Sequence, residues 1–262
     1  MDFELFKKAI DELVAVNQSF IDDQPVWLHH FGESLLHPNC MECIDYAVQK
    51  GIRACLSINP IVLKEELGKA LVESGLFLLY LSLDGHDEDS FFKIRGLKNA
   101  YQSSIDKILR FLELKRASKC TTKITISMID FEMNAESISQ TRSYWESVAG
   151  VDQFLLKSFS TWDGSAQDIN RYQSGFSCGS EKIECTLPWE RMTILWDGRV
   201  VPCCNDYDGK YVLGDLSNDT LAVIWNGHPM QTLRQEFNSN RVTNLLCRKC
   251  DKLRTPRHLM NW

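Results

Sequence analysis

The stretch Leu76-Phe77-Leu78-Leu79-Tyr80-Leu81-Ser82-Leu83 decides the fold class of this chain. It is a largely apolar run that ends at Asp84-Gly85, and such a run is typical of a strand buried on both faces of a parallel sheet. Amphipathic segments of helical period flank it on both sides. Further strands are predicted at 26–31, 52–58, 123–130 and 153–157. The alternation of helices and strands predicts a wound parallel α/β architecture.

The predicted helices follow from apolar spacings of three and four residues, and several of them end at a glycine. They cover residues 2–19, 39–50, 63–74, 100–114 and 135–149. Parallel sheets collect their ligands at the carboxyl ends of the strands. The residues that follow each strand are therefore the first candidates for a binding site.

The alternation stops near residue 163, and a different pattern follows it. Segment 163–184 is polar and rich in Ser, Gly, Asp and Gln, which indicates a bridge. Residues 192–201 predict a hairpin that turns at Asp197-Gly198, followed by a helix at 220–237 and a cysteine-bearing tail. We therefore predict an α/β domain at 1–162, a bridge at 163–184 and a small domain at 185–262.

Charge and composition exclude several classes of protein. The 262 residues carry 29 basic and 35 acidic side chains without a basic block, which argues against nucleic acid or an anionic membrane as the main partner. No apolar run approaches the roughly 18–20 residues of a membrane helix, and the first residues resemble no export signal. We expect a soluble, cytoplasmic protein that binds a small molecule or a peptide.

Ten cysteines in a reducing compartment point to metal or redox chemistry rather than to disulfides. Cys185 and Cys203 flank the predicted hairpin, and Cys247 and Cys250 form a Cys-x2-Cys pair. Four thiolates suit an iron–sulfur cluster or a structural zinc. Because a zinc ribbon normally brings two Cys-x2-Cys pairs, the pattern favours iron–sulfur. Cys178 and Cys204 could each replace one ligand, whereas we interpret Cys40, Cys43, Cys55 and Cys120 as ordinary buried side chains.

The carboxyl-terminal third resembles the SPASM/twitch auxiliary-cluster domain of radical S-adenosylmethionine (SAM) enzymes. The resemblance covers about 70 residues and rests on Cys185, Gly198 and Cys203 at the family spacing, followed by the Cys-x2-Cys pair. It implies one auxiliary 4Fe-4S cluster. A full SPASM domain would carry three more cysteines, so the resemblance is to the shorter twitch form. The implied ligands are Cys185, Cys203, Cys247 and Cys250.

The first 160 residues resemble the core of the same family, a partial (β/α)6 barrel. Gly32-Glu33 is similar to the Gly-Gly-Glu motif, whose backbone and carboxylate hold the SAM ammonium group. Glycine permits close backbone approach, and a carboxylate suits an amino group. The resemblance implies that SAM binds at residues at or near three strand ends, namely Gly32, Glu33, Ser57, Asn59, Ser82, Asp84 and Arg95.

One family element is not found in these residues. Radical SAM catalysis requires a Cys-x3-Cys-x2-Cys loop after the first barrel strand, and the pair Cys40-x2-Cys43 has Leu36 in place of the third cysteine. The segment 2–19 resembles the first barrel helix. We therefore expect that the first barrel strand and its cluster loop are missing from the chain.

The resemblance implies a radical SAM oxidoreductase that uses a 5′-deoxyadenosyl radical on a small alcohol-type or peptide substrate. The auxiliary cluster would accept an electron or position the substrate, and flavodoxin or ferredoxin would donate electrons. Two alternatives stay open: a non-catalytic iron–sulfur partner that transfers electrons or binds a substrate peptide, and a zinc-stabilised structural protein. Catalytic residues are not identified, and the candidates for the substrate pocket are Lys157, Trp162, Asp163 and Arg171.

Overall fold

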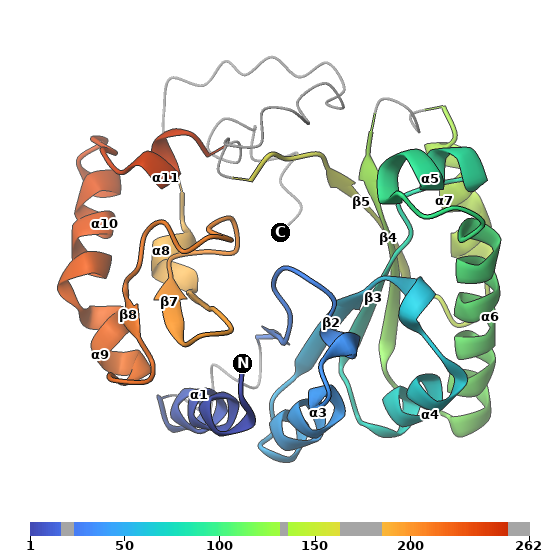
Figure 1. The fold of residues 1–262 in the computed structure, drawn as a ribbon, viewed down its shortest axis with the longest axis horizontal. Helices are drawn as coiled ribbons and strands as arrows, with labels where there is room; N and C mark the ends of the chain where they lie inside the picture. Colours follow the sequence, from blue (N-terminus) through green and yellow to red (C-terminus); the bar gives the residue numbers. More distant parts are fainter. Residues whose placement is uncertain (17–23, 132–135, 163–184, 251–262) are drawn as a thin grey trace. The chain divides into compact units, whose positions relative to one another are not determined.

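The computed structural model describes residues 1–16, 24–131, 136–162 and 185–250, which form two units (Figure 1). Unit 1 combines Met1–Val16 with Ser158–Trp262, and unit 2 is Asn17–Lys157. This division differs from the predicted domain at 1–162 because the first helix groups with the carboxyl-terminal residues. The predicted bridge at 163–184 lies outside the described residues.

Unit 2 is built on a five-stranded sheet. The strands run in the order β1-β2-β3-β4-β5, and the first four pair in parallel. This arrangement confirms the predicted α/β class. The strands are β1 (Val26–Trp27), β2 (Ala54–Ile58), β3 (Leu78–Ser82), β4 (Lys123–Asp130) and β5 (Gln153–Ser158).

The helices of unit 2 bury the apolar side chains of this sheet. Leu79 and Leu81 of β3 and Ile124 and Ile126 of β4 have no exposed surface. On β3 these residues alternate with half-buried Leu78, Tyr80 and Ser82. The helices are α3 (Cys40–Gln49), α4 (Glu65–Glu73), α5 (Glu88–Arg95), α6 (Tyr101–Ser118) and α7 (Ile138–Ser147), with short 3₁₀ turns at η1 (Ser34–Leu36) and η2 (Pro60–Val62).

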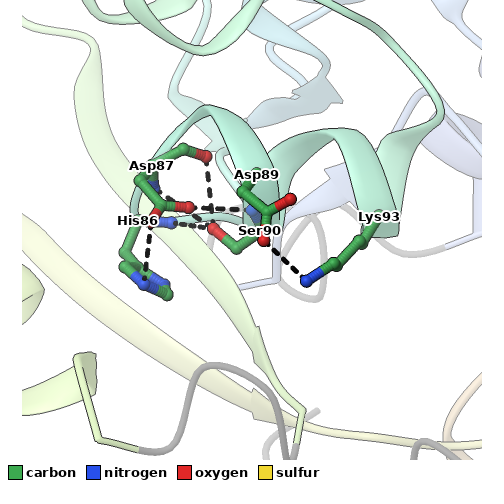
Figure 2. Close-up of polar contacts among 5 residues, drawn as sticks. All are labelled: His86, Asp87, Asp89, Ser90 and Lys93. Atoms are coloured by element: carbon green, nitrogen blue, oxygen red, sulfur yellow. Dashed lines mark hydrogen bonds and ion pairs between the residues drawn. The ribbon is translucent and has the colours of Figure 1, made fainter.

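Helix α5 was not among the predicted helices. Figure 2 shows its first turn, where the Asp87 carboxylate accepts a hydrogen bond from Ser90 N at 2.8 Å. Ser90 Oγ in turn accepts one from Asp87 N at 3.2 Å, which completes a capping box. Lys93 forms an ion pair with Asp89 at 2.6 Å on the exposed side. The Asp-x-x-Ser spacing is therefore the signal that would have predicted this helix.

Unit 1 contains a small antiparallel sheet and short helices. The predicted hairpin is present as β6 (Thr193–Ile194) and β7 (Arg199–Val201), with Gly198 at φ +95° in the turn, where glycine is favoured. A third strand, β8 (Gly214–Asp215), pairs with β7 and was not predicted. The helices are α1 (Phe3–Val16), α8 (Leu187–Glu190), α9 (Leu221–Asn226), α10 (His228–Asn238) and α11 (Leu245–Arg248).

Helix α1 packs on the core of unit 1, although its sequence resembles the first barrel helix. Ala9 is buried in an apolar cluster with Leu216 and Leu221. The Glu12 carboxylate accepts a hydrogen bond from Leu221 N at 2.6 Å, and Lys8 Nζ donates to the Leu216 carbonyl. The amphipathic pattern predicted a helix correctly but did not indicate which apolar surface it covers.

The helix predicted at 220–237 is two helices, α9 and α10, that meet at Gly227. Pro229 lies in the first turn of α10, where its missing N–H costs no intrahelical hydrogen bond. In a continuous helix, Pro229 would clash with the preceding turn. Across the described part of the chain, each helix is too short or too polar to pass through a lipid bilayer.

Candidate functional site

Four cysteine thiols converge in unit 1. Cys185 precedes α8, Cys203 follows β7, and Cys247 and Cys250 lie in and just after α11. Cys250 interacts electrostatically with each of the other three, and Cys247 does so with Cys185 and Cys203. Three segments that are distant in the sequence therefore place the predicted ligands close together.

Burial of these thiols changes their acidity. Burial is the main cause that raises the pKa of Cys247 to about 12, and the nearby Cys250 adds to the shift. Burial likewise raises the pKa of Cys185 to about 11 and that of Cys203 well above its usual value. Thiolates are the metal-binding form, so binding of a cationic iron–sulfur core would release protons and compensate the buried negative charge.

The candidate donor set is chemically suited to an iron–sulfur cluster. All four donors are sulfur, which is the ligand that four-iron clusters take from proteins. Among the described residues, no three His, Cys, Asp or Glu side chains lie close enough together to hold one metal ion. Cys204 is exposed beside Cys203, and Cys178 lies outside the described residues.

A buried arginine holds the segment that follows Cys185. Arg234 of α10 donates from Nε to the Pro188 carbonyl at 2.9 Å and from Nη1 to the Trp225 carbonyl at 3.0 Å. Its guanidinium group also lies 4.4 Å from the centre of the Trp225 ring. These contacts connect α8 with the end of α9, so the backbone beside Cys185 is tied to the core of unit 1.

Two polar contacts reach the Cys-x2-Cys pair. Asn244 caps α11 by accepting a hydrogen bond from Cys247 N at 2.9 Å, and its side-chain nitrogen donates to Glu236 at 2.6 Å. Asn205 Nδ2 donates to the sulfur of Cys250 at 3.5 Å. Hydrogen bonds to cluster sulfurs are among the factors that set the reduction potential of an iron–sulfur centre.

In unit 2, Glu33 connects two strand ends. Its carboxylate accepts hydrogen bonds from Asn59 N at 2.7 Å and from Leu35 N at 3.2 Å. Burial raises the pKa of Glu33, although both hydrogen bonds and Arg95 oppose that shift. A carboxylate with these two donors still has lone pairs for an ammonium group. Gly32 has φ +95°, and no other group occupies the position where its Cβ would lie.

A row of serine hydroxyls crosses the sheet beside Glu33. Ser57 Oγ of β2 lies 3.2 Å from Ser82 Oγ of β3, which lies 3.2 Å from Ser127 Oγ of β4. Each hydroxyl can donate or accept a hydrogen bond. The row therefore presents polar groups along three neighbouring strands.

Asp84 and Arg95 form an ion pair just beyond β3. Asp84 Oδ2 lies 2.5 Å from Arg95 Nη2, and Asp84 Oδ1 accepts a hydrogen bond from Ile129 N at 2.9 Å. Arg95 Nη2 also donates to the Ser82 carbonyl at 3.2 Å. Arg95 Nε is buried without a hydrogen-bond partner among the described residues, so it can still donate to a carboxylate.

The structure brings the predicted SAM-binding residues to one edge of unit 2. Direct hydrogen bonds or ion pairs form two groups among them: Glu33 with Asn59, and Ser57, Ser82, Arg95 and Asp84. The two groups interact electrostatically through Glu33 and Arg95. Gly32 precedes Glu33 in the chain. Cys40 also lies near Glu33, and burial, then Cys43 and Glu33, raises the pKa of the Cys40 thiol to about 12.

The substrate-pocket candidates are divided between the units. Lys157 lies in unit 2, with Nζ 5.1 Å from the centre of the Tyr80 ring. Trp162 lies in unit 1, with its ring 5.8 Å from that of Tyr207. Asp163 and Arg171 lie outside the described residues.

The sequence analysis did not identify several polar residues that the structure places beside these groups. His29 lies two residues beyond β1, and the rule that parallel sheets bind ligands at strand ends would have selected it. Asn205 follows Cys203-Cys204, so closeness to a predicted ligand was the available signal. No sequence signal indicated the contacts of Arg234 and Glu236, because their partners are distant in the chain.

Comparison with a protein-family model gives a match at residues 185–251 to SPASM, an iron–sulfur cluster-binding domain. The match contains the four converging cysteines. A curated relative from Pyrococcus furiosus is the tungsten-containing aldehyde ferredoxin oxidoreductase cofactor-modifying protein, 23% identical over 86% of this chain and 72% of that protein. Three other curated relatives are matched over less than half of their own length.

Solved structures share the fold at low sequence identity. BtrN, crystallised with AdoMet (SAM) and 2-DOIA, is 18% identical with a TM-score of 0.60, over 96% of this chain and 80% of that chain. The protein anSMEcpe, crystallised with AdoMet and the Cp18Cys peptide, is 17% identical with a TM-score of 0.62, over 97% of this chain and 79% of that chain. The two neighbours therefore combine this fold with bound AdoMet.

Proposed function

We propose that this chain, a radical SAM/SPASM protein, holds one four-iron cluster in unit 1 and binds SAM at the strand ends of unit 2. The observation that carries the proposal is the convergence of four thiols, Cys250 buried and the other three half-buried, within the matched cluster-binding region. The proposed cluster ligands are Cys185, Cys203, Cys247 and Cys250.

The proposed SAM site uses the chemistry of the strand-end residues. In this proposal, the Glu33 carboxylate accepts hydrogen bonds from the ammonium group of SAM. Arg95 Nε donates a hydrogen bond to the carboxylate of SAM. The hydroxyls of Ser57 and Ser82 and the carboxylate of Asp84 are available for the ribose. Gly32 permits close approach of the backbone, and Asn59 holds Glu33 in position. The AdoMet bound to the two fold neighbours supports this assignment.

The activity that we propose is that of an oxidoreductase. In chemistry of this type, SAM and iron–sulfur centres together supply a radical that abstracts hydrogen from the substrate. We propose a small alcohol-type molecule or a peptide as substrate, and flavodoxin or ferredoxin as electron donor. The peptide bound to anSMEcpe and the cofactor-modifying role in the name of the Pyrococcus relative support these classes.

A second candidate function is that of an iron–sulfur partner without SAM cleavage. The sequence feature that favours it is that no Cys-x3-Cys-x2-Cys occurs in the 262 residues. A cluster with four cysteine ligands also offers no open iron to SAM. Reductive cleavage would then require a cluster loop in addition to these residues.

Iron content after anaerobic reconstitution tests the cluster. We expect about four irons per chain, and the loss of most of them in Cys247→Ala. The matched control is Cys204→Ala, because Cys204 is exposed and adjacent to a proposed ligand, and it should retain the iron. A chain that takes one zinc and no iron would contradict the proposal.

Product analysis with SAM under dithionite separates the two functions. This chain alone should form no 5′-deoxyadenosine above background, whereas a version that also carries a Cys-x3-Cys-x2-Cys loop should form it and bind about eight irons. Failure of the extended version would favour the partner function. Deoxyadenosine from the present chain that disappears in Cys40→Ala would assign catalysis to Cys40 and Cys43 instead.

A further inference from the structure

Four side chains of unit 2 form a group that the SAM and cluster assignments do not use. We call it the lysine–histidine cluster, and it consists of His29, Lys157, Trp27 and Tyr80. Trp27 and Tyr80 meet edge to face at 4.8 Å, and Trp27 meets the His29 ring in the same way at 5.2 Å. Two aromatic rings therefore lie beside a lysine and a histidine, and the four side chains come from β1 and the residues just after it, β3 and β5.

Among the described residues, Lys157 is a cation that makes no ion pair. Its Nζ lies 5.1 Å from the centre of the Tyr80 ring, and it forms no hydrogen bond or ion pair with any of the described residues. Lys157 is half-buried, and burial lowers its pKa. The negative charge of Asp84 raises the pKa of Lys157, and the positive charge of Arg95 lowers it. Asp84 and Arg95 pair with each other. Among the described residues, Lys157 therefore has no carboxylate left to pair with directly, because Asp84 is paired with Arg95.

His29 is a neutral hydrogen-bond donor in the same place. Its Nδ1 accepts a hydrogen bond from Ser57 N at 3.1 Å, so the proton of the neutral ring is on Nε2. Burial, then the charges of Lys157 and His30, lowers the pKa of His29 to about 4. At neutral pH the imidazole is uncharged, and its Nε2–H has no partner in the described part of the chain.

We propose that the lysine–histidine cluster binds a carboxylate of the substrate, with Lys157 Nζ and His29 Nε2–H as donors and the Trp27–Tyr80 pair against the adjoining apolar part. The single ammonium group of Lys157 matches the single negative charge of a carboxylate. A dianionic phosphate would keep a second charge without a counter-ion in a half-buried place. The inference rests on the proposed function in one respect, which is that the bound carboxylate belongs to the substrate.

Benzoate is the probe for this site, because it combines one carboxylate with one aromatic ring. We expect saturable binding to the full reconstituted chain by calorimetry, with a matching shift of the His29 ring signals in NMR spectra. His29→Asn identifies those signals among the six histidines. Neutral benzamide should not bind. Benzamide binding as tightly as benzoate would overturn the proposal, and phenylphosphonate binding more tightly would overturn the choice of carboxylate.

Lysine variants locate the site. Lys157→Gln should weaken benzoate binding about tenfold, because a charge-assisted hydrogen bond is lost, whereas Lys157→Arg should retain it. Lys123→Gln is the matched control, since Lys123 also lies over an aromatic ring, at 5.3 Å from Phe77. Equal weakening in the Lys157 and Lys123 variants would overturn the assignment. The binding test does not measure iron or SAM cleavage, so its failure is distinguishable from failure of the proposed function.

Discussion

The parallel sheet of unit 2 and the small antiparallel sheet of unit 1 differ in what surrounds them. In unit 2, the five-residue strands β2 and β3 and the eight-residue β4 carry side chains with no exposed surface, such as Leu79 and Ile124. In unit 1, the strands have two or three residues, and an apolar cluster lies near four electrostatically coupled thiols, of which Cys185, Cys203 and Cys247 have raised pKa values. Burial of hydrocarbon side chains therefore contributes to the stability of the first sheet without any ligand.

This comparison indicates that the two units depend differently on a cofactor. Unit 2 has closed its core with side chains that need no ligand. In unit 1, a cluster would join the three segments that carry the convergent sulfurs, and metal binding contributes directly to folding in such sites. We therefore expect iron to stabilise unit 1 much more than unit 2.

The largest expected effect comes from cavities in the two cores. Leu79→Ala should lower the free energy of unfolding of unit 2 by about 2–5 kcal/mol and leave iron content unchanged. Leu233→Ala on α10, also with no exposed surface, should destabilise unit 1 similarly and release iron. Denaturant unfolding, followed by far-UV dichroism and by cluster absorbance, measures both. Val223→Ala, which is 57% exposed, is the control, and equal iron loss in both core variants would break the comparison.

A smaller effect is expected where α1 joins unit 1. Glu12→Ala removes the acceptor for Leu221 N at the first turn of α9, so unit 1 should lose about 1–2 kcal/mol. The thermal midpoint of cluster bleaching measures this loss. Glu4→Ala is the matched control on the same helix, because Glu4 is exposed and pairs only with Lys7 among the described residues. A Glu12→Ala effect no larger than that of the control would mean that α1 does not support unit 1.

The smallest expected effect is a pH dependence in unit 2. Burial raises the pKa of Asp152, but hydrogen bonds from Lys115 at 2.9 Å and Ile124 N at 2.7 Å outweigh it and lower the pKa overall. The pair therefore stabilises the fold above the unfolded pKa of about 3.9, and this stabilisation is lost as pH falls through the lower folded pKa.

Its magnitude should stay below about 1 kcal/mol, because the Asp152 side chain is 46% exposed. Urea midpoints of the apo chain at about pH 6 and about pH 3 should differ less in Asp152→Asn than in the parent chain. Asp106→Asn on α6 is the control, since among the described residues that carboxylate accepts only an exposed hydrogen bond from Gln102. An unchanged pH response in Asp152→Asn would exclude this carboxylate as its source.

Local features of the sequence determined most of the helices and strands of this protein and indicated its candidate cluster ligands. The apolar run at 76–83 predicted β3 because a strand buried on both faces needs apolar side chains on both. Asp197-Gly198 predicted the hairpin because its turn needs a residue with positive φ. The resemblance of Cys185, Cys203 and the Cys-x2-Cys pair to the twitch domain implied which thiols would lie near one another, and these thiols are electrostatically coupled.

Only the tertiary structure decided how these elements and charges meet. The apolar face of α1 is visible in its periodicity, but periodicity does not say which surface that face covers, and it covers the core of unit 1. Likewise, a lysine at the end of a strand is solvated or paired according to side chains that are distant in the chain. Lys157 lies over Tyr80 and near His29, while Asp84 already pairs with Arg95. Burial and electrostatics depend on distances through space, and a local sequence pattern does not contain those distances.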